Sequence, residues 1–126
     1  VPDMQLPIRY ALGVASRTDS RERGLTLADY ASLTFEKPDV EKFPCLTLAY
    51  KALDEGGTTA CAINAANEVA VAAFLDGKIK FLDIYNVITS TLEATDFIKQ
   101  PTYEDLVAIN SVARAKASEK IESTLK

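Results

Sequence analysis

The sequence predicts a mainly α protein, in which an irregular N-terminal arm with a short strand is followed by a four-helix bundle. From Pro44 onward, apolar residues recur about every 3.6 residues, which is the spacing of one helix face. Glycine and proline interrupt this pattern only briefly, so the connections are short and neighbouring helices should pack antiparallel. We therefore expect an arm or linker over residues 1–40 and a bundle over residues 41–126.

The arm is expected to hold only short elements. Residues 2–13 predict a helix that buries one side at best, and residues 14–24 are polar and charged, as is typical of a connector. In residues 32–36, Leu33 and Phe35 alternate with polar neighbours, which is the pattern of a short half-buried strand. Such short elements cannot build a core of their own.

The first helix of the bundle is expected over residues 44–54. Pro44 suits the first helical position, because the amide hydrogen that proline lacks would be unsatisfied there. Gly56-Gly57 ends the helix. The apolar residues of this helix that share one face and should pack into the bundle are Leu46, Ala49, Tyr50 and Leu53.

The second helix, expected over residues 58–77, is almost entirely small and apolar. Thr58 or Thr59 should cap its start, and its many alanines favour the helix and let neighbouring backbones approach closely. A helix that is apolar on every side belongs in the middle of a bundle.

One polar cluster interrupts this apolar helix. Asn64, Asn67 and Glu68 lie at positions i, i+3 and i+4, which places them together on the helix surface. Buried polar atoms there would need hydrogen-bond partners, because leaving one unpaired costs about 1–3 kcal/mol. We interpret the cluster as structural, fixing neighbouring loops or helix ends, rather than as catalytic.

Two further helices are expected, over residues 82–94 and 102–124. The last one begins with Thr102-Tyr103-Glu104-Asp105, in which a threonine followed three positions later by an acidic residue is a capping signal. The apolar residues expected on the buried faces of these two helices are Ile84, Val87, Ile88, Leu92, Leu106, Ile109, Ala113, Ala117 and Ile121.

The composition excludes several classes of function. The 126 residues are 48% hydrophobic and carry a formal net charge of −4, which argues against general binding to nucleic acid or anionic membranes. No apolar run reaches the ~20 residues that a membrane span needs. The chain has no histidine, which excludes most zinc sites and histidine-activated nucleophiles. Cys45 and Cys61 lie in apolar helical patterns and are expected to be reduced, buried thiols.

Three stretches together carry a resemblance to a known family. They are residues 2–8 (Pro-Asp-Met-Gln-Leu-Pro-Ile), residues 33–46, which include Leu-Thr-Phe-Glu-Lys-Pro-Asp and Phe-Pro-Cys-Leu, and residues 64–68 (Asn-Ala-Ala-Asn-Glu). In this order and spacing they resemble the C-terminal part of the 1-deoxy-D-xylulose 5-phosphate reductoisomerases. The resemblance covers essentially the whole chain.

The resemblance implies a much longer enzyme of the bacterial cytoplasm that is both an oxidoreductase and an isomerase. Members of the family need NADPH and a divalent cation, Mg²⁺, Mn²⁺ or Co²⁺. They convert 1-deoxy-D-xylulose 5-phosphate to 2-C-methyl-D-erythritol 4-phosphate in the non-mevalonate pathway of isoprenoid biosynthesis, and they are generally homodimers. The implied partners of this chain are the upstream NADPH-binding and catalytic domains of the same enzyme, with no nucleic acid and no membrane.

The resemblance also implies which residues this chain lacks. The family's metal ligands, substrate-binding residues and catalytic loop all precede the stretch that matches residues 2–8. We therefore expect no catalytic residue, no metal site, no bound cofactor and no activity of this chain alone. Residues 1–40 are implied to end the catalytic domain, and the whole chain to supply a scaffold and one wall of the active site.

Met4 is the residue through which the chain is implied to reach that active site. It matches a family methionine that lines the pocket beside the nicotinamide and the substrate, and Pro2 and Asp3 flank it in the same wall. A thioether is polarizable and packs well against aromatic rings, which suits this role. From its residue type alone, Met4 would be interpreted as a core filler.

Two other functions stay open on the residues alone. A free-standing helical adaptor would bind a partner through the arm and an exposed apolar face of the bundle. An independent small enzyme would have to draw on Asp, Glu, Lys, Tyr and Cys, and no constellation of these marks a site. The coding sequence upstream of Val1 would distinguish the three hypotheses.

Overall fold

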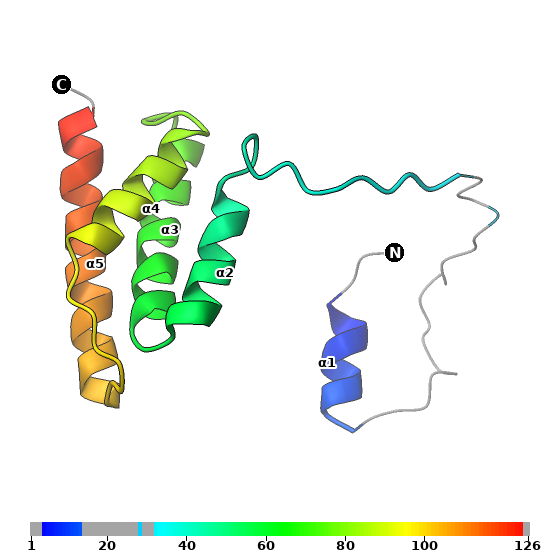
Figure 1. The fold of residues 1–126 in the computed structure, drawn as a ribbon, viewed down its shortest axis with the longest axis horizontal. Coiled ribbons are helices and arrows are strands. Elements are labelled where there is room, and N and C mark those ends of the chain that lie inside the picture. Colours follow the sequence, from blue (N-terminus) through cyan, green and yellow to red (C-terminus); the bar gives the residue numbers. More distant parts are fainter. Residues whose placement is uncertain (1–3, 14–27, 29–31, 125–126) are drawn as a thin grey trace. The chain divides into compact units, whose positions relative to one another are not determined.

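The computed structural model describes residues 4–13, 28 and 32–124 (Figure 1). The chain divides into two compact units, residues 1–37 and residues 38–126. None of the helices in the described part is long and apolar enough to cross a membrane. These helices are α1 (Gln5–Ala11), which belongs to the first unit, and α2 (Cys45–Glu55), α3 (Thr59–Leu75), α4 (Asp83–Glu93) and α5 (Tyr103–Thr124), which belong to the second.

The helix α1 ends where the backbone becomes left-handed at Gly13. The amide of Gly13 donates to the carbonyl of Tyr10 at 3.1 Å, and its φ of 71° is a value that glycine adopts without strain. Pro7 lies in the first turn, where its missing amide hydrogen removes no helical hydrogen bond. The helix predicted over residues 2–13 is thus confirmed over Gln5–Ala11.

The segment that leads toward the bundle is irregular. Residues 32–38 carry neither helix nor strand, and Leu33 and Phe35 are exposed. The short strand predicted over residues 32–36 is therefore wrong. Alternating apolar residues form a strand only where a neighbouring strand shares their backbone hydrogen bonds, and the described residues contain no strand to do so. The connector predicted over residues 14–24 lies outside the described residues.

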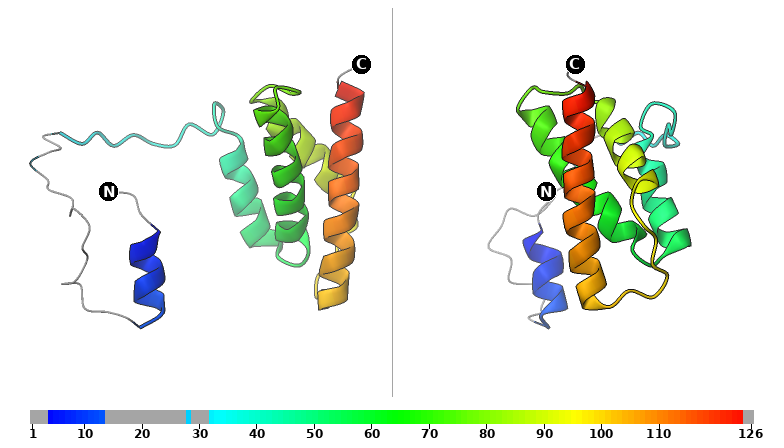
Figure 2. Two further views of the ribbon diagram at one scale, coloured as in Figure 1. Left: turned by 180° about the vertical axis from the view of Figure 1, so that it is seen from behind. Right: turned by 90° about the vertical axis from the view of Figure 1, so that its left-hand side faces the viewer.

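In the second unit, α3 lies in the middle and the other three helices pack around it (Figures 1 and 2). α2 and α5 lie on opposite sides of α3, and α4 packs against both α3 and α5. This arrangement confirms the predicted mainly α bundle of four helices, with the alanine-rich helix at its centre. The side chains of α3 that are buried are all small, namely Thr59, Ala62, Ala65, Ala66, Ala70 and Ala73.

The core combines small side chains on α3 and α5 with larger ones on α4. Ala113 and Ala117 of α5 have no exposed surface and cluster with the alanines of α3, which lets these two helices approach closely. Val87 and Ile88 of α4 are the largest of the core side chains that are almost completely buried. The buried faces predicted for α4 and α5 are confirmed, although Leu92 and Leu106 are only half-buried near the helix ends. 

The packing of α2 differs from the prediction. Leu48 is the only buried residue of α2, and Ala52 beside it is half-buried. The prediction that a broad apolar face of this helix packs into the bundle is wrong, because among the described helices α2 packs extensively against α3 alone. The four residues predicted on that face are all exposed, namely Leu46, Ala49, Tyr50 and Leu53.

The turn between α2 and α3 is tied to the loop between α4 and α5. The amide of Thr58 donates to the carbonyl of Ile98 at 3.0 Å, and the amide of Ile98 donates to the hydroxyl of Thr58 at 3.1 Å. Gly57 permits this contact, because a Cβ atom there would lie 2.4 Å from the carbonyl oxygen of Ile98. Since the Thr58 hydroxyl bonds to this loop and Thr59 makes no cap either, the predicted side-chain cap of α3 is wrong.

The start of α5 has the predicted capping box. The amide of Asp105 donates to the hydroxyl of Thr102 at 3.2 Å, and the amide of Thr102 donates to the carboxylate of Asp105 at 2.8 Å. Each side chain thus satisfies a backbone amide that has no partner within the helix.

This capping box should make the stability of the bundle depend on pH. Hydrogen bonds from the amide and the hydroxyl of Thr102 hold the pKa of the Asp105 carboxyl below its usual value. The stabilisation is therefore complete above the unfolded-state pKa and is lost as the pH falls through the lower folded-state pKa. We expect Asp105→Asn to lower the melting temperature by a few degrees at neutral pH, and by progressively less below roughly pH 4. A difference that stays constant across this range in circular dichroism melts would contradict the expectation.

One buried hydroxyl in α4 should be dispensable. The Oγ1 atom of Thr91 is buried and has no hydrogen-bond partner among the described residues. Replacing it by a methyl group in Thr91→Val should raise the free energy of unfolding by about 1 kcal/mol, since the desolvation cost of the hydroxyl is removed. Thr89→Val is the matched control, because the Thr89 hydroxyl donates to the carbonyl of Tyr85 at 3.0 Å. A loss of stability in Thr91→Val that equals the loss in the control, measured in urea melts, would contradict this prediction.

Candidate functional site

Met4, the predicted pocket residue, lies immediately before α1. Its backbone is already helical, with φ −75° and ψ −12°, and its carbonyl accepts the amide of Ile8 at 3.2 Å. The side chain is 70% exposed, so among the described residues Met4 does not fill a core. The thioether is thus held at a helix end and is exposed among the described residues. Pro2 and Asp3 lie outside the described residues.

The polar cluster on α3 links that helix to α5. Asn64 donates to Glu68 Oε1 at 3.0 Å, and Arg114 of α5 donates to Glu68 Oε2 in an ion pair. Arg114 is itself oriented by Asn110, whose Oδ1 accepts its Nε–H at 2.9 Å. The structural interpretation of the cluster agrees with these contacts, but the expected burial does not, since Asn64 and Glu68 are exposed and Asn67 is half-buried.

The electrostatics of this cluster also suit a structural role. The hydrogen bond from Arg114, followed by the one from Asn64 and the positive charge of Arg114, lowers the pKa of the Glu68 carboxyl. Glu68 is therefore ionised at neutral pH, whereas a general base needs a pKa near the working pH. An exposed ion pair of this kind is screened by salt and stabilises a protein only modestly.

Arg114 and Asn110 are partners of the cluster that the sequence pattern does not reveal. Their spacing of four residues places them on one face of α5, which is a weak signal that many surface pairs share. The pairing with Glu68 depends on which faces of α3 and α5 meet, and the sequence pattern alone does not give that.

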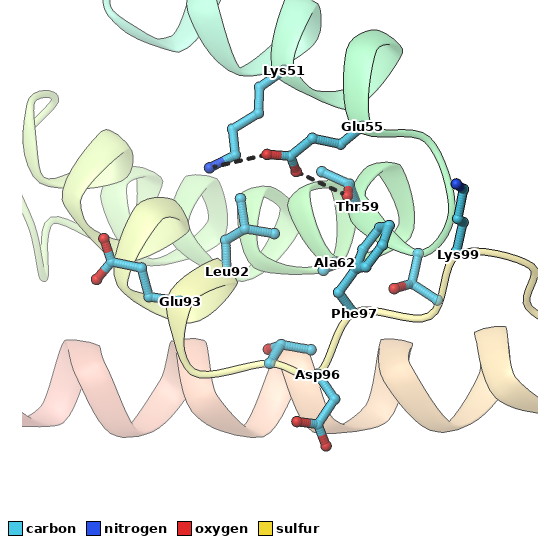
Figure 3. A pocket seen from close by; sticks show the side chains of 11 residues that line it. Lys51, Glu55, Thr59, Ala62, Leu92, Glu93, Asp96, Phe97 and Lys99 are labelled. Atoms are coloured by element: carbon cyan, nitrogen blue, oxygen red, sulfur yellow. Dashed lines mark hydrogen bonds and ion pairs between the residues drawn. The ribbon is translucent and has the colours of Figure 1, made fainter.

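A groove of about 520 Å³ opens where α2 ends and α3 begins, next to the loop between α4 and α5 (Figure 3). On one side, Lys51 points toward Glu55, with 3.6 Å between Nζ and Oε1, and the hydroxyl of Thr59 donates to Glu55 Oε2 at 3.2 Å. The apolar part of the lining is formed by Ala62, Leu92 and Phe97. The remaining lining residues are Thr58, Glu93, Thr95, Asp96 and Lys99.

The polar contacts in this groove lie within α2 and between α2 and α3. Its best-placed carboxylate, Glu55, is engaged by a lysine of its own helix and by a hydroxyl of α3, so it serves to hold two helices together. The groove contains neither a nucleophile beside a base nor a set of converging metal ligands. Among the described residues, no three His, Cys, Asp or Glu side chains lie close enough together to hold a metal ion.

Both cysteines are free. Cys61 is half-buried and its Sγ–H donates to the carbonyl of Leu106 at 3.4 Å, whereas Cys45 is exposed at the start of α2. The expectation of a buried thiol is therefore wrong for Cys45, which lies at the first position of α2 and lines a groove there. Partial burial still raises the pKa of the Cys45 thiol, which keeps it protonated and poorly nucleophilic.

The chain matches the sequences of one known protein family over nearly its whole length. The model of the DXP reductoisomerase C-terminal domain matches residues 1–116. The chain is 45% identical over 121 residues to 1-deoxy-D-xylulose 5-phosphate reductoisomerase of Bacteroides fragilis, covering 96% of the chain and 31% of that protein. It is 47% identical over 120 residues to the same enzyme of Paraburkholderia xenovorans, covering 95% of the chain and 30% of that protein.

Solved structures show the same relationship. The reductoisomerase from Zymomonas mobilis in complex with NADPH matches 97% of this chain and 32% of its own, with a TM-score of 0.83 and 40% identity. A DOX-P reductoisomerase in complex with magnesium matches 100% of this chain and 34% of its own, with a TM-score of 0.81 and 34% identity. The chain thus spans about a third of the length of the proteins it matches. The sequence match and the shared fold together show that it belongs to the DXP reductoisomerase C-terminal domain family.

Proposed function

We propose that the chain is the C-terminal part of a 1-deoxy-D-xylulose 5-phosphate reductoisomerase, in which it acts as a scaffold and supplies one wall of the active site. The whole enzyme would use NADPH and a divalent cation to convert 1-deoxy-D-xylulose 5-phosphate to 2-C-methyl-D-erythritol 4-phosphate. The observation that carries this proposal is the family match over residues 1–116. The described residues contain no cluster of metal ligands, which agrees with a role as a scaffold.

We propose a division of labour within the chain. Residues 1–40 would end the catalytic domain, and residues 41–126 would form the helical domain. The boundary between the two compact units, which falls between Lys37 and Pro38, supports a division close to this point. The described residues offer no converging oxygen ligands and no glycine-rich turn for a pyrophosphate, so NADPH and the cation would both be held by the upstream domains.

Met4 would be the contribution of this chain to the pocket. Its exposed thioether, held at the start of α1, is available to pack against a nicotinamide ring or a substrate brought by the upstream domains. Its role would be to bind and orient, since a thioether moves no proton.

In the full-length enzyme, we expect Met4→Ser to lower kcat/KM by about tenfold, which corresponds to about 1.4 kcal/mol of lost transition-state stabilisation. The melting temperature should hardly change, because Met4 is exposed in the chain's own structure. Met4→Leu, which keeps an apolar side chain of similar size, should retain most of the activity. Steady-state kinetics beside melting curves measure both effects, and an unchanged kcat/KM in Met4→Ser would remove Met4 from the site.

The proposed function is tested by comparing the full-length protein with the 126-residue chain. The full-length protein should consume NADPH in the presence of 1-deoxy-D-xylulose 5-phosphate and Mg²⁺ or Mn²⁺, followed by the loss of absorbance of the reduced nicotinamide. The chain alone should show no turnover and no binding of NADPH in calorimetry. An inactive full-length protein would overturn the proposal, and micromolar binding of NADPH by the chain alone would overturn the division of labour.

We also propose that the full-length enzyme is a cytoplasmic homodimer that binds neither nucleic acid nor membranes. The net charge of −4 supports the last two points for this part of the enzyme, since nucleic acid and anionic membranes both attract a basic surface. Sedimentation velocity of the full-length enzyme would measure the oligomeric state directly, and a monomer at micromolar concentration would contradict it.

A further inference from the structure

The outward side of α2 carries an apolar stripe. Leu46, Tyr50 and Leu53 are spaced at i, i+4 and i+7, which places them along one side of the helix. They are 45%, 67% and 80% exposed, and we name these three residues the docking face. Exposed apolar residues scattered singly are normal on a protein surface, whereas apolar residues gathered in one patch are typical of interaction sites.

An apolar groove of about 340 Å³ continues the docking face at the start of α2. Leu46 belongs to both, and the groove runs from there between the residues that precede α2 and the loop that precedes α4. No ionisable carboxylate or ammonium group lines it. The other lining residues are Phe43, Pro44, Cys45, Phe81, Leu82 and Tyr85.

Within the described unit, no other helix covers this surface. α2 fixes itself to α3 through Leu48, which is buried in the common core, while its docking face points away from α3. α2 lies at one side of the bundle and α5 at the other, so no helix of the described unit can reach round to cover it (Figures 1 and 2). The surface therefore fits a partner that is itself apolar and shaped to a helix and a groove.

We propose that the docking face and its groove are covered by the upstream body of the same polypeptide in the full-length enzyme. This inference rests on the proposed function, because it requires a longer protein. A related enzyme is long enough to contain such a body, since the chain spans only 31% of the length of the reductoisomerase of Bacteroides fragilis. The domain interface would bury Tyr50 and Leu53, which the chain by itself leaves in water.

The position of the docking face favours the upstream body over a second copy of the chain. The boundary between the two compact units falls after Lys37, so residues 38–45 separate it from Leu46. A body in the same polypeptide has an effective concentration that is set by the length of the connecting segment and reaches the millimolar range for short ones. A second copy or a free protein at micromolar concentration would compete poorly for the same surface.

A pair of polar substitutions on the docking face tests the proposal. Tyr50→Gln with Leu53→Gln should leave the melting temperature of the 126-residue chain within about one degree of wild type, since both side chains are exposed there. In the full-length enzyme the same two substitutions should lower the melting temperature by several degrees, because the upstream body would lose its apolar contacts with the docking face. The matched control is Tyr103→Gln with Val107→Gln, whose side chains are 76% and 50% exposed on α5, a helix that lies on the other side of α3 from α2. The control pair should leave both proteins near wild type.

Three outcomes would overturn the proposal. One is a full-length test pair that melts like wild type, and another is a control pair that destabilises the full-length enzyme as much as the test pair does. The third is a 126-residue chain that dimerises in sedimentation velocity, with the dimer abolished by the test pair, since the occupant would then be a second copy.

A direct readout of burial completes the test. Hydroxyl-radical labelling of Tyr50 should fall at least about fivefold from the 126-residue chain to the full-length enzyme, because a residue in an interface core is shielded from water. Equal labelling in both would contradict the proposal. Failure of the proposed function is seen separately, as a wild-type full-length protein that consumes no NADPH. An active wild type whose Tyr50 remains fully labelled would mean that the docking inference alone has failed.

Discussion

Gly57→Ala should destabilise the helical bundle by about 2–4 kcal/mol, the sum of backbone strain and a forced displacement of the neighbouring loop. The φ of Gly57 is 54°, which a residue with a Cβ atom adopts only at a cost. A Cβ atom there would also lie 2.4 Å from the carbonyl oxygen of Ile98 and 2.8 Å from a ring carbon of Phe97. Backbone cannot rotate away as a flexible side chain can, so the loop between α4 and α5 would have to move.

Gly77→Ala separates the two causes of this loss. Gly77 has a similar φ of 72°, but nothing lies within 4 Å of a Cβ atom placed there. We expect Gly77→Ala to lower the free energy of unfolding by about 1–2 kcal/mol, which is the cost of backbone strain alone. Urea unfolding followed by circular dichroism measures both variants, and equal losses for Gly57→Ala and Gly77→Ala would show that the loop yields without cost.

The second large effect concerns the close contact of α3 with its neighbours. Ala66 and Ala70 have no exposed surface and lie in the same core cluster as Leu48, Ile88 and Ala117. Leucine at either position would have to push helices apart, so Ala66→Leu and Ala70→Leu should each destabilise the bundle by about 1–3 kcal/mol.

Ala72→Leu is the control within the same helix. Ala72 is exposed, and leucine has nearly the helix propensity of alanine, so this variant should change the free energy of unfolding by less than about 0.5 kcal/mol. Denaturant melts in which Ala70→Leu behaves like Ala72→Leu would show that α3 has room beside it and that the packing described here is wrong.

Helix positions could be predicted from the sequence because their signals are local. The predicted first helix, residues 44–54, is observed as Cys45–Glu55, and the last, residues 102–124, as Tyr103–Thr124. Gly56-Gly57 and the Thr102-x-x-Asp105 box act within a single turn of chain, so the sequence around them is sufficient.

The errors arose where a tertiary partner decides the outcome. The periodicity of α2 predicts that Leu46, Ala49, Tyr50 and Leu53 face the core, but only the strip around Leu48 meets α3. Periodicity alone does not tell which of two apolar strips has a neighbouring helix. The strand at residues 32–36 failed for the same reason, since a strand exists only with its pairing partner. The sequence predicts Thr58 or Thr59 as the cap of α3, but the Thr58 hydroxyl accepts the amide of Ile98, which is 40 residues away, and the Thr59 hydroxyl donates to Glu55.

The candidate site was accessible to sequence reasoning only through the family. Nothing in the spacing around Met4 distinguishes a pocket residue from a core filler, and its exposure emerged only from the structure. The link between Glu68 and Arg114 joins positions 46 residues apart, so it depends on the packing of α3 on α5 and has no local signature.

The contact between Gly57 and Ile98 also limits where this domain can accept added sequence. Because the two loops at that end exchange hydrogen bonds in both directions, neither can be lengthened without dislodging the other. The turn at Gly77, at the other end of α3, faces open space and has no such partner among the described residues. A fluorescent tag, an affinity epitope or new chain termini are therefore best introduced at the Gly77 turn, where the helices they separate stay in register.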